Sequence, residues 1–138
     1  MPDCVFCRIA AGEIPSVRID ESADHLAFLD VGPLAAGHTL LISKQHFSDI
    51  RDVPPDLLNR LTGHLPRLAR AILEATGATG LNVLQNTGAS SGQSVFHFHI
   101  HLIPRVEGDK LGYRWNAGKY GPDEAAQMQA KIVASLGR

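Results

Sequence analysis

The sequence predicts an α+β fold: a five-stranded antiparallel sheet with one main helix and a short N-terminal helix. Two observations support this class. Short runs of β-branched and apolar residues follow one another with only turns between them, and the strongest helical periodicity is confined to one central segment. Adjacent strands with helices grouped elsewhere are typical of α+β domains, and they differ from the strand–helix alternation of a doubly wound sheet.

The expected elements follow in order along the chain. A short helix is predicted over residues 4–12, and a loop containing Gly and Pro over residues 32–37. A second loop, rich in Gly and Ser, covers residues 86–92, and the tail combines a Gly-rich loop with a short helix over residues 123–136. The strands are predicted at residues 17–19, 25–30, 38–43, 81–85 and 95–103.

The main helix is predicted between Asp52 and Gly77. Asp52 and the two prolines that follow Val53 form a helix start signal. Pro66 lacks a backbone N–H inside the segment, so we expect a kink or a break there. The apolar residues that recur at helical spacing are Leu57, Leu58, Leu61, Leu65, Leu68, Ile72 and Leu73.

Length and charge limit the class of protein. A chain of 138 residues with 44% hydrophobic residues can bury one sizeable core but is too short for two ordinary domains, so one domain is expected over residues 1–138. The 13 basic and 14 acidic residues give a net charge of −1, which provides no global field to hold nucleic acid or an acidic membrane. No apolar run approaches the roughly 18 residues needed to cross a bilayer, and no export signal is recognised, so a cytoplasmic protein is expected.

Three of the seven histidines fall within five residues, at His97, His99 and His101. Strand side chains alternate between faces, so the predicted strand places all three imidazoles on one face. A wet strand face normally carries Thr, Ser, Lys or Glu, which makes a merely structural role for this row a poor explanation. The opposite face is expected to carry the apolar residues Phe96, Phe98, Ile100 and Leu102.

The chemistry of this histidine row is expected to be nucleophilic rather than metal-binding. Neighbours on one strand face lie about 6.6–7 Å apart, because the strand rises about 3.3 Å per residue. Three such side chains do not comfortably reach one ion with bonds of about 2.0–2.1 Å. A neutral imidazole nitrogen can instead act as a nucleophile or transfer a proton, which suits phosphoryl chemistry.

The only cysteines, Cys4 and Cys7, form a C-x-x-C pair. They are too close in sequence to brace a fold of this size as a disulfide that closes a long loop. Metal binding is therefore the first interpretation, while redox chemistry and no role at all stay open, although no βαβ context suggests a thioredoxin-like role.

Together these features resemble the histidine-triad (HIT) family. The resemblance rests on the spaced histidines, on the Gly92-Gln93-Ser94 segment before them and on the loop residue Asn86, which occur together and in order. Residues 4–44 resemble the N-terminal half of the family domain, and the chain is most similar to the bacterial Hint-like branch. The resemblance implies a HIT-like α+β fold and a homodimer.

The resemblance implies that His99, the middle histidine of the triad, attacks the α-phosphorus of a nucleotide and becomes covalently nucleotidylated. No catalytic metal is required for this step. His101 would donate a hydrogen bond to a phosphate oxygen, and His38 matches a histidine that supports this group. Ser94 matches a residue that contacts the phosphate and the leaving group.

The resemblance also implies a purine nucleotide site. Asp30 matches the acidic residue that accepts hydrogen bonds from the ribose hydroxyls, and Asn86, Gly92 and Gln93 match the segment around the phosphate. Without the resemblance, a plain turn explains Asn86 and Gly92 equally well. The apolar walls of the base pocket would be Val5, Phe6, Ile9, Phe28 and Leu40, although the sequence alone favours core packing for such residues.

For the cysteine pair, the resemblance implies a structural zinc ion. Zinc-binding members of the family add a histidine after the third strand and the first histidine of the triad, which here are His46 and His97. Cys4, Cys7, His46 and His97 would form a closed four-ligand site, the structural kind. His25 and His64 match nothing functional and are expected to be surface or locally satisfied residues.

The resulting hypothesis is a nucleoside phosphoramidase or related hydrolase that cleaves nucleoside phosphate derivatives at the α-phosphate. The nearest alternative is a dinucleoside polyphosphate hydrolase of the diadenosine tetraphosphate type, with the same nucleophile and another leaving group. An alternative of a different class is a nucleotide-binding regulatory protein whose turnover is incidental.

Overall fold

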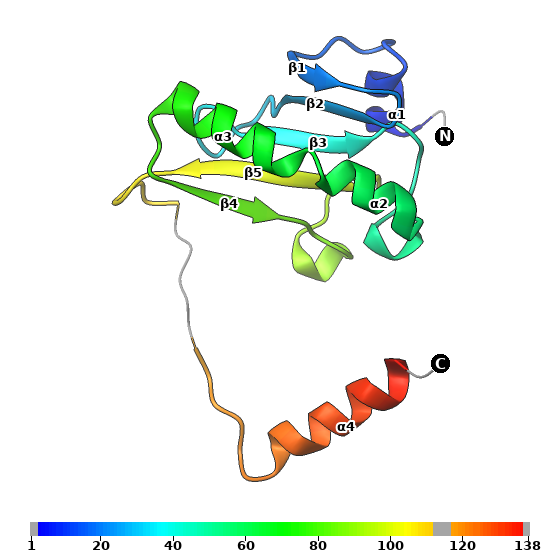
Figure 1. Cartoon of the computed structure of the whole chain (residues 1–138), viewed down its shortest axis with the longest axis vertical. Coiled ribbons are helices and arrows are strands. Elements are labelled where there is room, and N and C mark those ends of the chain that lie inside the picture. Colours follow the sequence, from blue (N-terminus) through cyan, green and yellow to red (C-terminus); the bar gives the residue numbers. More distant parts are fainter. Residues whose placement is uncertain (1–2, 112–116, 137–138) are drawn as a thin grey trace.

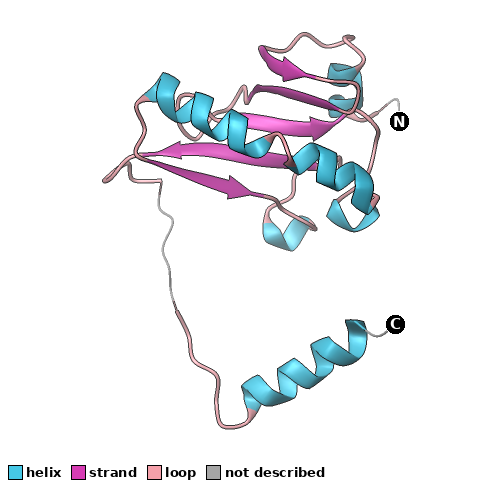
Figure 2. Cartoon of the chain, viewed as in Figure 1, coloured by secondary structure: helices cyan, strands magenta, loops and turns pink. Residues whose placement is uncertain are grey.

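The structure is a computed structural model that describes residues 3–111 and 117–136. The order of the helices and strands along the chain can be followed by colour in Figure 1 and by type in Figure 2. The elements are α1 (Val5–Ala10), β1 (Arg18–Glu21), β2 (His25–Leu29), β3 (Thr39–Ser43), α2 (Pro55–Thr62), α3 (Leu65–Thr76), β4 (Gly80–Leu84), β5 (His99–Arg105) and α4 (Glu124–Leu136), with short 3-10 turns at Ile50–Asp52 and Ala89–Ser91.

The predicted five-stranded antiparallel sheet is confirmed, with the strand order β1-β2-β3-β5-β4. β5 lies between β3 and β4, so the strand that carries His99 and His101 is paired on both sides. His101 lies opposite Leu40, and His99 lies opposite Ile42. On the neighbouring strand, the side chain beside each imidazole is therefore apolar.

Each face of the sheet carries its own apolar cluster. α2 and α3 cross one face (Figure 1), and α1 packs on the other. Phe98, Ile100 and Leu102 belong to the α2–α3 side, so the period-two alternation turns the histidines of β5 toward α1. The cluster on the α1 side contains Phe6, Ile9, Leu26, Phe28, Leu40 and Ile42.

The expected break in the main helix is confirmed. α2 ends at Thr62 and α3 begins at Leu65, so the chain breaks at Gly63 and His64 rather than at Pro66 itself. Pro66 occupies the first turn of α3, where a backbone N–H has no partner within the helix and proline is tolerated. α3 ends at Thr76 and is capped by Gly77, whose φ of 69° is the left-handed conformation that glycine adopts readily.

The predicted limits of the histidine strand, 95–103, are wrong at both ends. β5 begins at His99, so His97 precedes the strand, and Phe96 is 50% exposed instead of sharing the core face. The strand also continues through Pro104 to Arg105. Pairing with β3 ends at Leu102, so the missing N–H of Pro104 costs no bond to that neighbour. The other strands lie within two residues of their predicted limits.

His25 and His64 form a cluster on the α2–α3 side. His25 is buried and locally satisfied, which is the second of the two expected alternatives: its Nε2–H donates to Asp20 Oδ2 at 2.8 Å, and its Nδ1 lies 2.6 Å from Ser22 Oγ. The His64 ring stacks on His25 with centroids 3.8 Å apart. Arg67 donates to both carboxylate oxygens of Asp20, at 3.2 and 2.6 Å, which ties α3 to β1.

We predict that Asp20→Asn destabilises the protein in a pH-dependent way. Hydrogen bonds from Arg67 and His25 lower the pKa of Asp20 to about 2. A depressed carboxyl pKa contributes stability above the ordinary pKa of about 4 that is lost as the pH falls toward 2. Urea unfolding at pH 7 should show a loss of about 1–2 kcal/mol, after allowance for partial exposure.

The loss in Asp20→Asn should shrink toward zero as the pH approaches 2. Asp56→Asn, an exposed carboxylate on α2, serves as the control and should change the free energy of unfolding little. A loss in Asp20→Asn that stays constant from pH 7 to pH 2 would contradict this assignment.

The tail carries the predicted C-terminal helix, observed as α4. In Figure 1 this helix stands apart from the sheet, and none of its residues is buried. The Gly-rich loop expected before it includes residues 112–116, which lie outside the described part of the chain. No helix among the described residues is long and apolar enough to span a bilayer. A single domain over residues 1–138 remains a prediction.

Candidate active site and metal centre

The histidine face of β5 lies under α1, where Phe6 packs against it. The Phe6 ring meets the His99 ring edge-on with centroids 5.0 Å apart, and it meets the His97 ring at 5.9 Å. The His99 and His101 rings lie 5.0 Å apart. The structure therefore brings the three histidines of the sequence pattern onto one side, with His97 and His99 buried and His101 half-buried.

Hydrogen bonding determines which nitrogen of His99 carries the proton. Its Nδ1 lies 2.6 Å from the backbone carbonyl oxygen of His97. A carbonyl oxygen only accepts, so Nδ1 bears the hydrogen and Nε2 keeps its lone pair. Burial lowers the pKa of His99, which favours the neutral ring. The arrangement gives His99 a neutral, nucleophilic Nε2.

His38 and His101 form a directed chain of hydrogen bonds. The backbone N–H of Leu34 donates to His38 Nδ1 at 3.1 Å, so the neutral His38 ring carries its proton on Nε2. His38 Nε2 lies 2.9 Å from His101 Nδ1 and therefore donates to it. Burial lowers the pKa of His38, and burial with repulsion from His99 and His38 lowers that of His101 to about 4. His101 is thus a neutral ring whose remaining N–H, on Nε2, can serve as a donor.

A cavity of about 370 Å³ opens beside these histidines. Its polar side chains come from Asp30, Ser94, His99, His101 and Ser16. All five apolar residues predicted for a base pocket line it, and all of them except the exposed Val5 also belong to the core cluster on the α1 side. Its apolar lining consists of Val5, Phe6, Ile9, Ile14, Pro15, Phe28, Val31, Leu40 and Val95.

Asp30 follows β2 at the rim of this cavity. Its Oδ1 accepts a hydrogen bond from the backbone N–H of Gly32 at 2.9 Å, which orients the carboxylate. Its Oδ2 lies 3.6 Å from His38 Nε2. The carboxylate therefore lies beside the His38–His101 pair, and its charge opposes the effect of burial on the pKa of both rings.

Asn86 and Gly92 lie together in the loop between β4 and β5, outside the lining of the cavity. Gly92 has a φ of 108°, and a Cβ there would lie 3.4 Å from the Asn86 side-chain nitrogen. The backbone conformation requires glycine, whereas the distance to Asn86 is an ordinary contact. The structure supports the turn interpretation of these two residues, and a contact with phosphate remains a prediction.

Gln93, a predicted substrate-binding residue, lies outside the lining of the cavity. Its side chain is buried. Its Oε1 accepts from the backbone N–H of Gly88 at 2.8 Å, and its Nε2 donates to the carbonyl oxygens of Ser48 and Val95 at 2.7 and 3.1 Å. Because its amide group is engaged by backbone partners, we assign Gln93 to holding the loop before Ser94 rather than to direct substrate contact.

Five residues that line the cavity were not predicted from the sequence: Ile14, Pro15, Ser16, Val31 and Val95. Most lie in loops, where no periodic pattern marks a face. Val95 is the exception, since it lies in the predicted strand on the histidine face, two residues before His97. Extending that alternation by one step would have found it.

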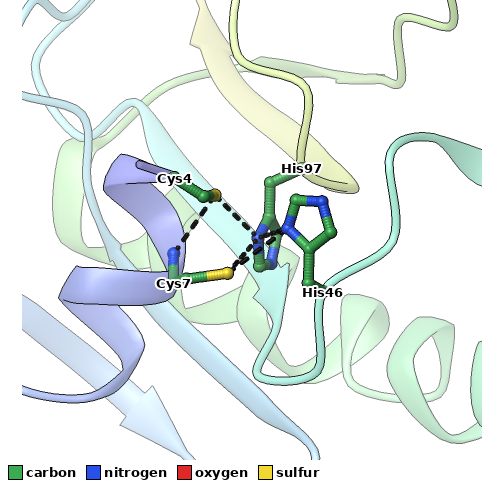
Figure 3. A group of neighbouring side chains, drawn as sticks. All are labelled: Cys4, Cys7, His46 and His97. Carbon is green, nitrogen blue, oxygen red and sulfur yellow. Dashed lines mark hydrogen bonds between the residues drawn. The ribbon is translucent and has the colours of Figure 1, made fainter. Parts of the chain in front are cut away.

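Cys4, Cys7, His46 and His97 form a group able to hold a metal ion. Figure 3 shows their side chains converging from α1, from the segment after β3 and from the segment that enters β5. The Nδ1 atoms of His46 and His97 lie 3.2 Å apart. His97 Nδ1 lies 3.3 Å from Cys4 Sγ and 3.5 Å from Cys7 Sγ, and Cys7 Sγ lies 3.3 Å from His46 Nδ1.

These distances suit a tetrahedral zinc ion. Bonds of about 2.0–2.3 Å at tetrahedral angles separate ligand atoms by roughly 3.3–3.7 Å. His97 Nε2–H donates to the carbonyl oxygen of Ser43 at 2.6 Å, so the His97 Nδ1 lone pair faces the other donors. A backbone carbonyl that fixes the ring in this way is a common partner of a metal-binding histidine. The donor set therefore fits zinc in a closed site.

Comparison with known proteins identifies the family. The sequence model of the HIT domain matches residues 11–108. Over 137 residues the chain is 39% identical to "Protein hit" of Bacillus subtilis, covering 97% of this chain and 94% of that protein. It is 35% identical over 140 residues to the adenosine 5'-monophosphoramidase HNT1 of Candida albicans, covering 98% and 92%. The chain belongs to the HIT family.

A third relative and two solved structures extend the comparison. The adenylylsulfatase HINT3 of Arabidopsis thaliana is 43% identical over 109 residues, which cover 79% of this chain and 55% of that protein. SMU.412c of Streptococcus mutans superimposes with a TM-score of 0.90 at 38% identity, over 99% of this chain and 87% of the other. A zinc-bound histidine triad family protein of Mycobacterium smegmatis gives a TM-score of 0.76 at 37% identity, over 99% and 96%.

Proposed function

We propose that this protein is a nucleotide hydrolase that cleaves purine nucleoside phosphoramidates through a nucleotidyl-histidine intermediate on His99. The observation that carries the proposal is the His99 ring itself: its Nδ1–H is held by the His97 carbonyl, and it lines a cavity suited to a nucleoside. The names of two relatives, a monophosphoramidase and an adenylylsulfatase, both describe cleavage at an adenylyl phosphate and support the same class of reaction.

In the proposed first step, His99 Nε2 forms a bond to the α-phosphorus as the bond from phosphorus to the leaving group breaks. The N–H of His101 stabilises the negative charge on a phosphate oxygen. The departing amine takes a proton, which the Ser94 hydroxyl can pass on, because an amide anion is too basic to leave near pH 7. Water then cleaves the phosphorus–His99 bond, releasing the nucleotide and restoring the ring.

Other residues of the predicted site bind the nucleotide. In the proposal, Asp30 accepts hydrogen bonds from the ribose hydroxyls, and Asn86 and Gly92 lie near the phosphate. The base lies against the apolar wall, whose members are Val5, Phe6, Ile9, Phe28 and Leu40. A homodimer and a cytoplasmic location complete the proposal, with a small-molecule nucleotide and neither nucleic acid nor a membrane as the partner.

We also propose that Cys4, Cys7, His46 and His97 hold a structural zinc ion. When bound, zinc would fasten α1 to the segment that enters β5, next to the nucleophile. The four protein ligands complete a tetrahedral coordination sphere and leave no position for substrate. His97 contributes its ring to this group and its carbonyl to His99, so the metal centre supports the site without entering the chemistry.

Cys4→Ala is expected to lower the melting temperature of the zinc-loaded protein by about 5–10 °C, because one ligand of the proposed site is lost. The rate constant of the chemical step should change far less than the melting temperature. The control is the same pair of proteins after chelation, where the difference should shrink. No zinc by elemental analysis in protein purified without chelator, with an unchanged melting curve for the variant, would remove the zinc assignment.

The function is tested by offering the wild-type protein adenosine phosphoramidate and diadenosine tetraphosphate side by side. We expect a higher kcat/KM for the phosphoramidate, and intact-mass spectra of quenched reactions should show an adenylyl group on the protein. Faster cleavage of the polyphosphate would favour the dinucleoside polyphosphate hydrolase. Tight binding of nucleotide with negligible turnover of both compounds would favour a regulatory nucleotide-binding protein.

A further inference from the structure

One hydroxyl in the cavity wall lacks the partner that buried polar groups normally have. Ser16 Oγ is the only buried side-chain nitrogen or oxygen atom, among the residues that the structure describes, without a hydrogen-bond partner. A buried group left unpaired costs about 1–3 kcal/mol, which makes such an atom worth explaining. Ser16 also lines the 370 Å³ cavity.

The other polar side chains of the cavity already have roles in the proposed function. Asp30 is assigned to the ribose, and Ser94, His99 and His101 are assigned to the phosphate and the leaving group. Ser16 is the one polar lining side chain that remains. Its chain neighbours Ile14 and Pro15 line the cavity as apolar residues, so its hydroxyl belongs to the wall expected to meet the base.

The backbone holds Ser16 in place. On one side, the N–H of Ile14 donates to the carbonyl oxygen of Arg8 in α1 at 3.3 Å. On the other, the N–H of Leu29 in β2 donates to the carbonyl oxygen of Val17 at 3.0 Å. With the loop tied to α1 and β2, the hydroxyl needs only a change of side-chain rotamer to turn toward a ligand.

We infer that Ser16 is a specificity-determining residue that hydrogen-bonds the edge of the purine base. This inference rests on the proposed function. A hydroxyl can donate to a ring nitrogen or accept from an exocyclic amine, so either kind of base atom can provide the missing partner. The base would thereby satisfy a group that is unpaired in the ligand-free cavity, and selectivity would come from the base atom that Ser16 meets.

The test is a cycle that combines Ser16→Ala with substrates lacking one base atom each. The phosphoramidates of adenosine, 1-deazaadenosine, 3-deazaadenosine, 7-deazaadenosine and purine riboside are compared by kcat/KM. With wild-type protein, one analogue should lose about 2- to 13-fold relative to adenosine, the equivalent of one hydrogen bond. With Ser16→Ala, the adenosine compound should lose a similar factor, and that same analogue should lose nothing further.

The melting temperature without ligand is a second measurement. If Ser16 had a structural role, its substitution would lower the melting temperature. Because Ser16→Ala removes an unpaired buried hydroxyl, its melting temperature should be unchanged or higher. Ser90→Ala, in the exposed turn at Ala89–Ser91, is the matched control and should leave the pattern of analogue selectivity unchanged.

The outcomes separate this inference from the proposed function. If the wild-type protein cleaves no nucleoside phosphoramidate, the proposed function fails. If it cleaves them and Ser16→Ala keeps the full pattern of analogue losses, Ser16 does not contact the base and this inference is overturned. A lower melting temperature with equal slowing of every substrate would also overturn it, since Ser16 would then act as a structural residue.

Discussion

His99→Ala should abolish turnover of the phosphoramidate while the fold and nucleotide binding stay nearly intact. The substitution removes the attacking Nε2 from the wall of a cavity and leaves the apolar cluster under α2 and α3 untouched. Loss of a covalent route lowers the rate of the chemical step by several orders of magnitude, and we expect a fall in kcat of about 10³-fold or more.

Steady-state kinetics and the mass of the quenched protein check this prediction together. His99→Ala should bind nucleotide with nearly the wild-type dissociation constant and should show no adenylyl adduct. His64→Ala, which removes a histidine on the opposite face of the sheet, is the control and should retain both turnover and adduct. Near-normal turnover in His99→Ala, with adenylate attached to another residue, would show that the nucleophile is misassigned.

The second large effect is expected for Ser94→Ala, with a selectivity that depends on the leaving group. Ser94 is exposed and lines the cavity beside His99 and His101. An amine needs a proton to leave and a polyphosphate needs none, so loss of the hydroxyl should slow only the phosphoramidate. Loss of a positioned proton donor typically costs about 10²–10⁴-fold.

The measurement is kcat/KM for adenosine phosphoramidate and diadenosine tetraphosphate with the wild-type protein, Ser94→Ala and Ser90→Ala. The Ser90 variant changes a hydroxyl in the exposed turn before Gly92 and should affect neither substrate. Equal slowing of both substrates by Ser94→Ala would show that this serine only positions the phosphate.

Alternation along the chain predicted the two faces of β5 correctly. It did not predict the limits of the strand, which depend on pairing with neighbouring strands. Alternation from Phe98 to Leu102 correctly separated the apolar face from the histidine face, because the period of a strand is fixed by its backbone. The start of β5 depends instead on pairing with β3, which begins only at His99. Phe96 therefore lies outside the ladder and outside the core, which no local pattern indicates.

In the candidate site, too, some positions were predicted correctly and others are shown only by the structure. The resemblance selected Cys4, Cys7, His46 and His97 by position along the chain, and the structure brings their ligand atoms within 4.8 Å of one another. It likewise selected the five apolar cavity residues for which the sequence alone favoured core packing. For Gln93 the resemblance implied a substrate contact, whereas the structure turns the amide toward the backbone of the loop.

Three features were predictable from the sequence alone: the class of fold, the separation of the two strand faces and the break in the main helix. These follow from the periods of strands and helices and from proline chemistry, which act over a few residues. Three further properties depend on the tertiary structure: which nitrogen of His97 faces the other metal-ligand atoms, which nitrogen of His101 carries its proton, and that Ser16 lines the cavity wall unpaired. Those properties depend on the carbonyl of Ser43, the amide of Leu34 and the packing of α1, groups brought together by folding from distant parts of the chain.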